Sequence, residues 1–222
     1  MQILTKSVTN NDLNDIIDFD NRYLINMLIE LEIPKEQLPS SLTINDIEQA
    51  ILRGDVLEWI VIDNELAGYY WFEFKPDYLY IAGLAIKPNF QGMGLLQRIL
   101  RSAEEKADEH QLKSCRLLVI PLNGRAVNAY LKYGYKIITC NLASYFGPQY
   151  PHSYRFTMEK NLSFQENTGI AIDSREIICT DYELIKNLTD QGYVGVELIR
   201  SSNQHNKENK ILFKTSPRRS SI

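Results

Sequence analysis

The spacing of apolar residues predicts alternating helices and strands in the first half of the chain. A short strand is predicted at residues 3–8. Apolar residues then recur at steps of three and four from residue 13 to residue 31, which predicts an amphipathic helix with a break near Asp20–Asn21. Thr43 is a good N-cap for a second helix that ends by Gly54. Strands follow at residues 58–63, 66–74 and 78–86, and the first two form a predicted hairpin around Asn64–Glu65.

The second half of the chain continues the alternation and then changes in polarity. Helices are predicted at residues 95–112 and 123–133, and strands at residues 115–120, 135–141 and 154–158. A polar, linker-like stretch follows Lys160, and beyond it the pattern predicts a strand, a helix and two further strands. We therefore expect a main domain at residues 1–160 and a small accessory segment at residues 161–222, which is too short to bury a strong core alone.

Composition and charge narrow the class of protein. The 222 residues are 44% apolar, which is typical of a globular chain. The net charge of the whole chain is −4. Residues 201–222 alone carry about +4, so the first 200 residues carry about −8. This acidic body argues against a nucleic-acid binder. The sequence has no apolar run long enough to span a membrane, and its N-terminal segment does not resemble a signal peptide.

The three cysteines, Cys115, Cys140 and Cys179, are odd in number and lack the spacing of a metal motif. We therefore expect buried reduced thiols, no disulfide framework, no metal site and a cytoplasmic location.

The most informative segment is the predicted strand–loop–helix around Gly92 and Gly94. A helix that follows a glycine-containing turn offers unpaired N–H groups and a positive dipole end, which together can hold a phosphate. The two glycines would let the backbone approach the anion closely. An ordinary strand-to-helix turn would have the same composition, and the spacing fits neither the Rossmann fingerprint nor the P-loop.

Two motifs together resemble the GNAT superfamily of N-acetyltransferases. Gln91-Gly92-Met93-Gly94 matches the family's Gln/Arg-x-x-Gly-x-Gly/Ala element in its first places, and Leu96 stands where the family usually has Gly or Ala. Downstream, the segment from Asn123 to Tyr135 is similar to the family's Asn-x-x-Ala-x-x-x-Tyr-x-x-x-Gly-Phe element. The resemblance covers about residues 1–160. It implies an α/β (α+β) mixed sheet that is mostly antiparallel, with splayed parallel middle strands flanked by helices.

The resemblance also implies a reaction and a set of site residues. Acetyl-CoA would be the co-substrate, and its acetyl group would pass to a primary amine by direct attack. Its pantetheine would run along the backbone of residues 84–87, and its pyrophosphate would lie on the amides of residues 91–96. Tyr130 would be the general acid that protonates the departing thiolate. The cofactor-binding residues would be Leu84, Ala85, Ile86, Lys87, Gln91, Gly92, Met93, Gly94, Leu95, Leu96, Asn123 and Tyr130.

Neither the general base nor the acceptor follows from the sequence. The strands that would flank the thioester carry no carboxylate, so Glu73, at the end of a strand, and His152, in an aromatic loop, are candidates by residue type alone. A water chain to backbone carbonyls, or an amine that is already partly neutral, would serve equally well. A small-molecule or peptide amine is the expected acceptor, and residues 161–222 could form a homodimer contact. The missing carboxylate and Leu96 keep a second hypothesis open, in which the protein is a non-catalytic acyl-CoA-binding or regulatory module.

Overall fold

The computed structural model describes residues 2–34, 38–142, 154–162, 173–201 and 208–215. The chain divides into two units, residues 1–116 and 117–222, and strand β5 (Ser114–Val119) spans the division. The helices and strands predicted from the apolar pattern are present within a few residues of their expected ends. This division is distinct from the domain boundary that the sequence predicts near Lys160, and that boundary stays a prediction.

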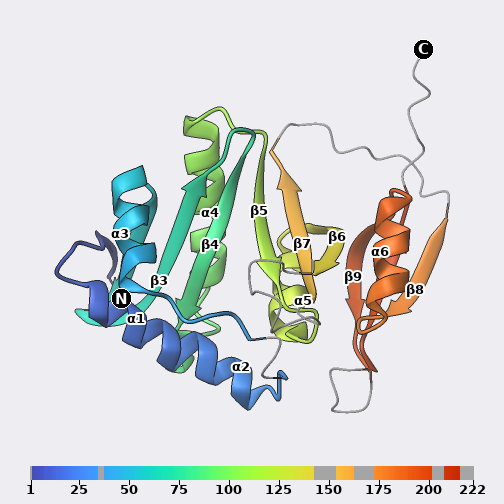
Figure 1. Ribbon diagram of the computed structural model, residues 1–222, viewed down its shortest axis with the longest axis horizontal. Helices are drawn as coiled ribbons and strands as arrows, with labels where there is room; N and C mark the ends of the chain where they lie inside the picture. Colours follow the sequence, from blue (N-terminus) through green and yellow to red (C-terminus); the bar gives the residue numbers. More distant parts are fainter. Residues whose placement is uncertain (1, 35–37, 143–153, 163–172, 202–207, 216–222) are drawn as a thin grey trace. The chain divides into compact units, whose positions relative to one another are not determined.

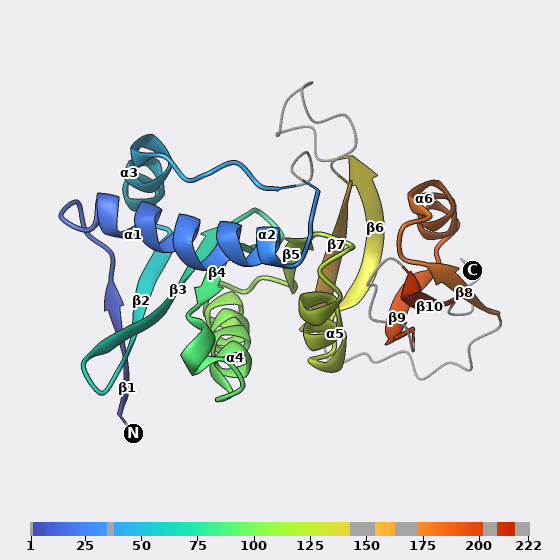
Figure 2. The ribbon, with the colours of Figure 1, turned by 90° about the horizontal axis from the view of Figure 1, so that it is seen from below.

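Among the described residues of the first unit, four antiparallel strands lie side by side. In spatial order they are β1 (Ile3–Ser7), β2 (Val56–Ile62), β3 (Glu65–Phe74) and β4 (Tyr78–Ile86). Strands β3 and β4 are labelled in Figure 1, and all four are labelled in Figure 2. The β2–β3 hairpin turns at Asp63 and Asn64, which have φ values of 47° and 69°, one residue earlier than expected. Short polar Asp and Asn side chains tolerate this left-handed conformation better than most residues.

Helices cover both faces of this sheet (Figure 2). One face carries α1 (Leu13–Asp20), the π-helical turn η1 (Asn21–Ile25), α2 (Asn26–Glu30) and α3 (Ile44–Arg53), and the other carries α4 (Leu95–Glu109). The predicted break near Asp20–Asn21 is therefore a widened turn in which the chain stays helical. Helix α3 begins with a capping box between Thr43 and Asp46, and it ends at Gly54 with φ 76°.

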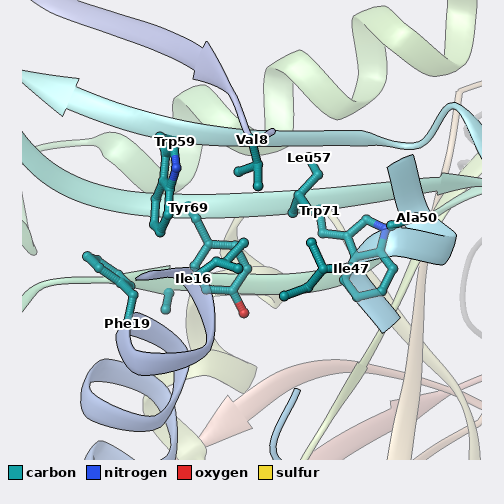
Figure 3. Close-up of a cluster of buried hydrophobic side chains, with 10 residues drawn as sticks. Val8, Ile16, Phe19, Ile47, Ala50, Leu57, Trp59, Tyr69 and Trp71 are labelled. Atoms are coloured by element: carbon teal, nitrogen blue, oxygen red, sulfur yellow. The ribbon is translucent and has the colours of Figure 1, made fainter. Parts of the chain in front are cut away.

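The core between α1, α3 and the sheet is rich in aromatic side chains (Figure 3). Tyr69 of β3 lies edge-on to Phe19 of α1 and Trp59 of β2, at ring-centroid distances of 6.1 and 6.3 Å. Its ring is 1% exposed, and its hydroxyl oxygen points away from its own strand. The tyrosines of β3 thus fill the sheet core, because aromatic residues combine strand propensity with a large buried area.

The second unit contains a five-stranded antiparallel arrangement and two helices. Its strands lie in the order β7 (Tyr154–Asn161), β6 (Lys136–Leu142), β9 (Val194–Ile199), β10 (Lys210–Lys214) and β8 (Ser174–Ile178). Helix α5 (Gly124–Lys132) packs on β9, and α6 (Tyr182–Asp190) packs on β6. Gly195 of β9 leaves room for side chains of the neighbouring strands, since a Cβ there would lie 2.9 Å from Ile211 of β10 and 3.0 Å from Ile137 of β6.

The cysteines and the apolar character of the helices were also considered in the sequence, and the structure describes both. Cys115, Cys140 and Cys179 are free and buried, as expected, and burial raises the pKa of the Cys140 thiol to about 12. In the described ranges, no helix combines the length and apolar character needed to cross a membrane.

Candidate functional site

The loop between β4 and α4 presents a row of backbone N–H groups. After β4 the chain forms a short 3-10 turn (Pro88–Phe90), and α4 begins after Gly94 with no side chain acting as a cap. Among the described residues, none accepts a hydrogen bond from the N–H groups of residues 92–97. Consecutive free donors at the N-terminus of a 15-residue helix form a site for a phosphate or pyrophosphate.

Both glycines of the loop have the backbone conformation that this role requires. Gly92 has φ 81° and Gly94 has φ 78°, values that residues with a side chain rarely adopt. The position of a Cβ on Gly92 has no heavy atom within 4 Å, so open space lies over the loop. The residues present therefore fit the diphosphate group of an acyl-CoA.

The side chains at the ends of the loop hold it in place. The Gln91 side chain donates from Nε2 to the carbonyl of Ile86 at 3.0 Å, which links the loop to the end of β4. The Lys87 ammonium lies 3.2 Å from Glu65 and 5.8 Å from the centre of the Tyr23 ring. The side chains of Gln91 and Lys87 therefore bond to other groups of the protein. The groups that the loop offers to an anion are its backbone N–H groups.

A β-bulge interrupts β4 immediately before the expected pantetheine strand. Trp71 of β3 pairs with Gly83 and Phe72 pairs with Ile81, so Ala82 is the extra residue. A close approach accompanies the bulge, because a Cβ at Gly83 would lie 3.1 Å from the Tyr69 hydroxyl. Residues 84–86 then pair regularly with β3.

In the second unit, α5 carries the two downstream residues of the family-like motif. The Asn123 side-chain oxygen accepts from Ala126 N at 3.1 Å, so Asn123 caps the helix, while its amide nitrogen is not used in that bond. Tyr130, seven residues further on, is half-buried, and desolvation raises the pKa of its phenol to about 12. The phenol thus stays protonated at neutral pH and can donate.

Of the two candidate bases named from the sequence, the structure describes only Glu73. The Glu73 carboxylate on β3 lies 2.5 Å from the Lys75 ammonium and 3.6 Å from the Arg53 guanidinium. Glu73 is thus ion-paired with two cations, and its role as base stays a prediction. His152 lies outside the described residues.

The structure reveals a buried carboxyl group that the sequence analysis did not consider. Asp20, at the end of α1, is 3% exposed and accepts a hydrogen bond from the Tyr69 hydroxyl. Burial raises the pKa of Asp20 to about 6, although the bond from Tyr69 acts in the opposite direction. A signal was available in the sequence: Asp20 lies four residues after Ile16 and four before Leu24, within the apolar stripe of the helix.

A cavity of about 500 Å³ lies beside the same helix. Asp12, Asp15 and Asp18 line it together with Lys6, Arg22 and Lys87, and its aromatic wall consists of Phe19, Tyr23 and Trp59. Its three carboxylates are balanced by three cations, so the cavity does not select a ligand by net charge.

Solved structures with the same fold are N-acetyltransferases of diverse origin. The PaiA N-acetyltransferase of Thermoplasma acidophilum, in complex with coenzyme A, is 18% identical, with a TM-score of 0.59 over 72% of this chain and 99% of the other. The ribosomal-protein-S18-alanine N-acetyltransferase of Escherichia coli is 13% identical, with a TM-score of 0.57 over 76% and 99%. Arabidopsis thaliana Naa50, bound to a bisubstrate analogue, is 14% identical, with a TM-score of 0.57 over 72% and 99%.

The sequence comparison agrees with the structural one. A search of curated protein sequences gives no match. The model of the acetyltransferase (GNAT) family matches residues 25–135, which is half of the chain and includes the loop between β4 and α4, Asn123 and Tyr130. The fold and the family match together confirm the resemblance seen in the sequence. The chain therefore belongs to the acetyltransferase (GNAT) family, and it is an acetyltransferase with acetyl-CoA as its co-substrate.

Proposed function

We propose that the protein transfers the acetyl group of acetyl-CoA to a primary amine by direct nucleophilic attack. The observation that carries the proposal is the row of free N–H groups at residues 92–97, with two positive-φ glycines, inside the segment that matches the family. The pyrophosphate would lie on this row. The pantetheine would lie along residues 84–87, and Asn123 would donate to it through its amide nitrogen.

The roles of the chain's own residues follow from this placement. The neutral amine attacks the thioester carbonyl, and the C–S bond breaks. The thiolate takes a proton from the Tyr130 hydroxyl, and the proton that the new amide nitrogen loses returns through water to Tyr130. A phenol whose pKa is about 12 is a weak acid, so its main contribution is a hydrogen bond that strengthens as negative charge develops on sulfur. The acceptor is a primary amine of a peptide or a small molecule, as the names of the structural relatives suggest by analogy.

The proposal can be tested with acetyl-CoA and three amines. Calorimetry measures acetyl-CoA binding, and thiol release measures turnover with spermidine, with an aminoglycoside and with a short peptide that has a free N-terminus. Binding together with turnover of at least one amine supports the proposal. Absence of acetyl-CoA binding contradicts it.

A matched pair of glycine variants tests the phosphate-binding loop. Gly92 and Gly54 both have a positive φ and open space at the Cβ position, so glutamate strains the backbone similarly at either site. Gly92→Glu is expected to abolish acetyl-CoA binding, because its carboxylate would repel the diphosphate. Gly54→Glu, at the end of α3, is expected to bind normally. Equal affinities of the two variants would place the diphosphate elsewhere.

The alternative is a non-catalytic acyl-CoA-binding or regulatory module. Two observations favour it: neither β4 nor β5 carries a carboxylate, and Leu96 replaces a small residue of the motif. Binding of acetyl-CoA without turnover of any of the three amines would support this alternative.

Residues 161–222 are proposed as an accessory segment that forms a homodimer contact. Exposed apolar side chains at Ile178 and Leu184, 46% and 39% exposed, support this proposal. Sedimentation of the full chain and of the Ile178→Lys variant tests it, and a monomeric full chain would contradict it. A cytoplasmic location, inferred from three buried free thiols, stays a prediction.

A further inference from the structure

Asp20 is a buried carboxyl group without a compensating cation. Its carboxyl accepts a hydrogen bond from Tyr69, and in the described part of the chain no lysine, arginine or histidine forms an ion pair with it. Burying a carboxylate in this way opposes folding at neutral pH, because the charge loses its hydration. The turn that follows, η1, is a π-helical segment, a feature that often marks functional positions.

The partner of Asp20 leads directly to β4. The Tyr69 hydroxyl lies so close to Gly83 that a side chain there would meet it, and Gly83 follows the bulged residue Ala82. The absence of a side chain at Gly83 leaves the hydroxyl against the β4 backbone. The Asp20 carboxyl is therefore hydrogen-bonded to a hydroxyl that itself lies against the backbone at Gly83.

The position of Gly83 along the strand relates this hydrogen bond to the reaction, and this step rests on the proposed function. The pyrophosphate would lie on residues 92–97, which follow β4, and the pantetheine would lie on residues 84–87. The thioester must then be at the other end of the pantetheine, next to Gly83. The amine that attacks it loses a proton at that place, so a proton acceptor is needed there.

The other titratable groups around Asp20 are exposed or already bonded. Asp15 and Asp18 of α1 and Arg22 of η1 are exposed. On α3, Asp46 belongs to the capping box and Arg53 pairs with Asp55. On β2, Glu58 accepts from Tyr70. Burial and the hydrogen bond from Tyr69 are thus the influences on the pKa of Asp20.

We propose that Asp20 is the final proton acceptor in the acetylation of the amine, and that Tyr69 relays the proton to it. The attacking ammonium gives its proton to a water molecule at Gly83. That water passes a proton to the Tyr69 oxygen while the Tyr69 hydroxyl proton moves to the Asp20 carboxylate. The amine lone pair then forms the C–N bond, and the C–S bond breaks. The thiolate takes its proton from Tyr130, and the surplus proton on the new amide nitrogen passes through water to the Tyr130 phenolate, which restores the phenol. The protonated Asp20 returns its proton to solvent by the same path.

The chain offers a matched control for this path. Tyr70, the next residue on β3, also donates to a carboxylate, that of Glu58, and alternation along the strand directs it to the opposite face of the sheet. Asp20→Asn and Tyr69→Phe remove the proposed path, whereas Glu58→Gln and Tyr70→Phe remove a similar bond outside it. The probe is the amine that wild type acetylates best among spermidine, an aminoglycoside and a peptide with a free N-terminus.

The test measures kcat, the pH dependence of kcat and the affinity for acetyl-CoA. At pH 7.5, Asp20→Asn and Tyr69→Phe should lower kcat by about 100-fold, the scale of general-base catalysis, while acetyl-CoA affinity by calorimetry and the activity of both controls stay unchanged. The deficit should shrink as the pH approaches the pKa of the amine, because a neutral amine no longer needs the base. In wild type, kcat should fall below a pH of about 6, where Asp20 becomes protonated.

Three results would overturn the inference. Wild-type kcat and an unchanged pH profile in Asp20→Asn would exclude Asp20 while leaving the acetyltransferase function intact. Equal losses in the Tyr69 and Tyr70 variants would indicate a general packing defect. Acetyl-CoA binding without turnover by wild type would contradict the proposed function and this inference together. If Asp20→Asn does not fold, the wild-type acid limb and Tyr69→Phe decide the question.

Discussion

At the scale of single residues, Asp20 shows how a chemical role can oppose stability. The pKa of Asp20 is about 6 in the folded protein, whereas an aspartate in an unfolded chain has a pKa of about 3.9. At low pH the carboxyl is neutral in both states, and these are the conditions in which Asp20 favours folding most. That contribution is lost as the pH rises through 6, because the folded protein must then hold a buried charge. The aromatic core around Tyr69 gives no structural reason for a carboxylate at this position.

Replacing Asp20 by asparagine should therefore stabilise the protein at neutral pH. The amide keeps the volume and can accept the Tyr69 hydrogen bond without a charge. We expect Asp20→Asn to raise the free energy of unfolding relative to wild type by up to about 3 kcal/mol at pH 8, and to confer no such gain at pH 4. Urea unfolding at both pH values measures the difference. A difference that does not change with pH would contradict the buried charge.

Tyr130 should act on turnover and not on binding. Tyr130→Phe removes the hydroxyl and keeps the ring, whose centre lies 6.1 Å from that of Tyr135. We expect kcat to fall by about 100-fold or more, because the thiolate loses its donor, with an unchanged dissociation constant for acetyl-CoA. Tyr133→Phe, on the same helix end, is the control. Equal losses of kcat and affinity would argue against Tyr130 as the acid.

At the scale of elements, local sequence signals decide where helices begin and end. Helix α3 begins at Thr43 because its hydroxyl accepts from Asp46 N at 3.2 Å, while the Asp46 carboxylate accepts from Thr43 N at 2.9 Å. Helix α4 has the opposite character, since Gly94 provides no cap and leaves its donors free. One helix satisfies its own end, and the other keeps its end available for a ligand.

Removing the α3 cap should cost stability without affecting chemistry. Thr43→Ala deletes one half of the capping box, and we expect the free energy of unfolding to decrease by about 1 kcal/mol. The acetyl-CoA dissociation constant should stay unchanged. Ser41→Ala, two residues earlier and exposed, is the control for loss of a hydroxyl. A normal stability for Thr43→Ala would mean that the capping box contributes little.

At the scale of the whole molecule, the net charge of the chain does not favour its anionic ligand. The chain carries a net −4 and its ligand is an anion, so long-range attraction cannot account for binding. The loop from residue 88 to residue 97 contains no lysine or arginine, and the Lys87 ammonium pairs with Glu65. We therefore expect short-range backbone dipoles, and not long-range attraction, to hold the diphosphate.

Acetyl-CoA affinity should consequently depend little on salt. Screening weakens attraction between separated charges, but it has a small effect on N–H groups in direct contact with a phosphate. We expect the dissociation constant to change by less than about threefold between about 20 and 300 mM salt, measured by calorimetry. A marked loss of affinity with salt would indicate that exposed cations such as Arg98 and Arg101 hold the phosphates.

Local signals allowed most helices and strands to be predicted from the sequence. They also predict a phosphate-binding role for the loop at residues 91–96, and that role stays a prediction. Apolar spacing gave the helices and strands, and the order Gln91, Gly92, Gly94, then Asn123 and Tyr130, gave the family, because these features depend on residues close together in the chain. The turn at Asp63 was displaced by one residue, since several polar residues there can adopt a positive φ.

What only the tertiary structure decided is which distant side chains meet. Asp20 and Tyr69 are 49 residues apart, and they meet because α1 packs across β3. Glu73 has the residue type of a base, yet the fold pairs it with the Lys75 ammonium and the Arg53 guanidinium. A sequence fixes which groups exist and how each segment folds locally, whereas packing determines burial, and burial changes the pKa of Asp20 and makes it a candidate proton acceptor.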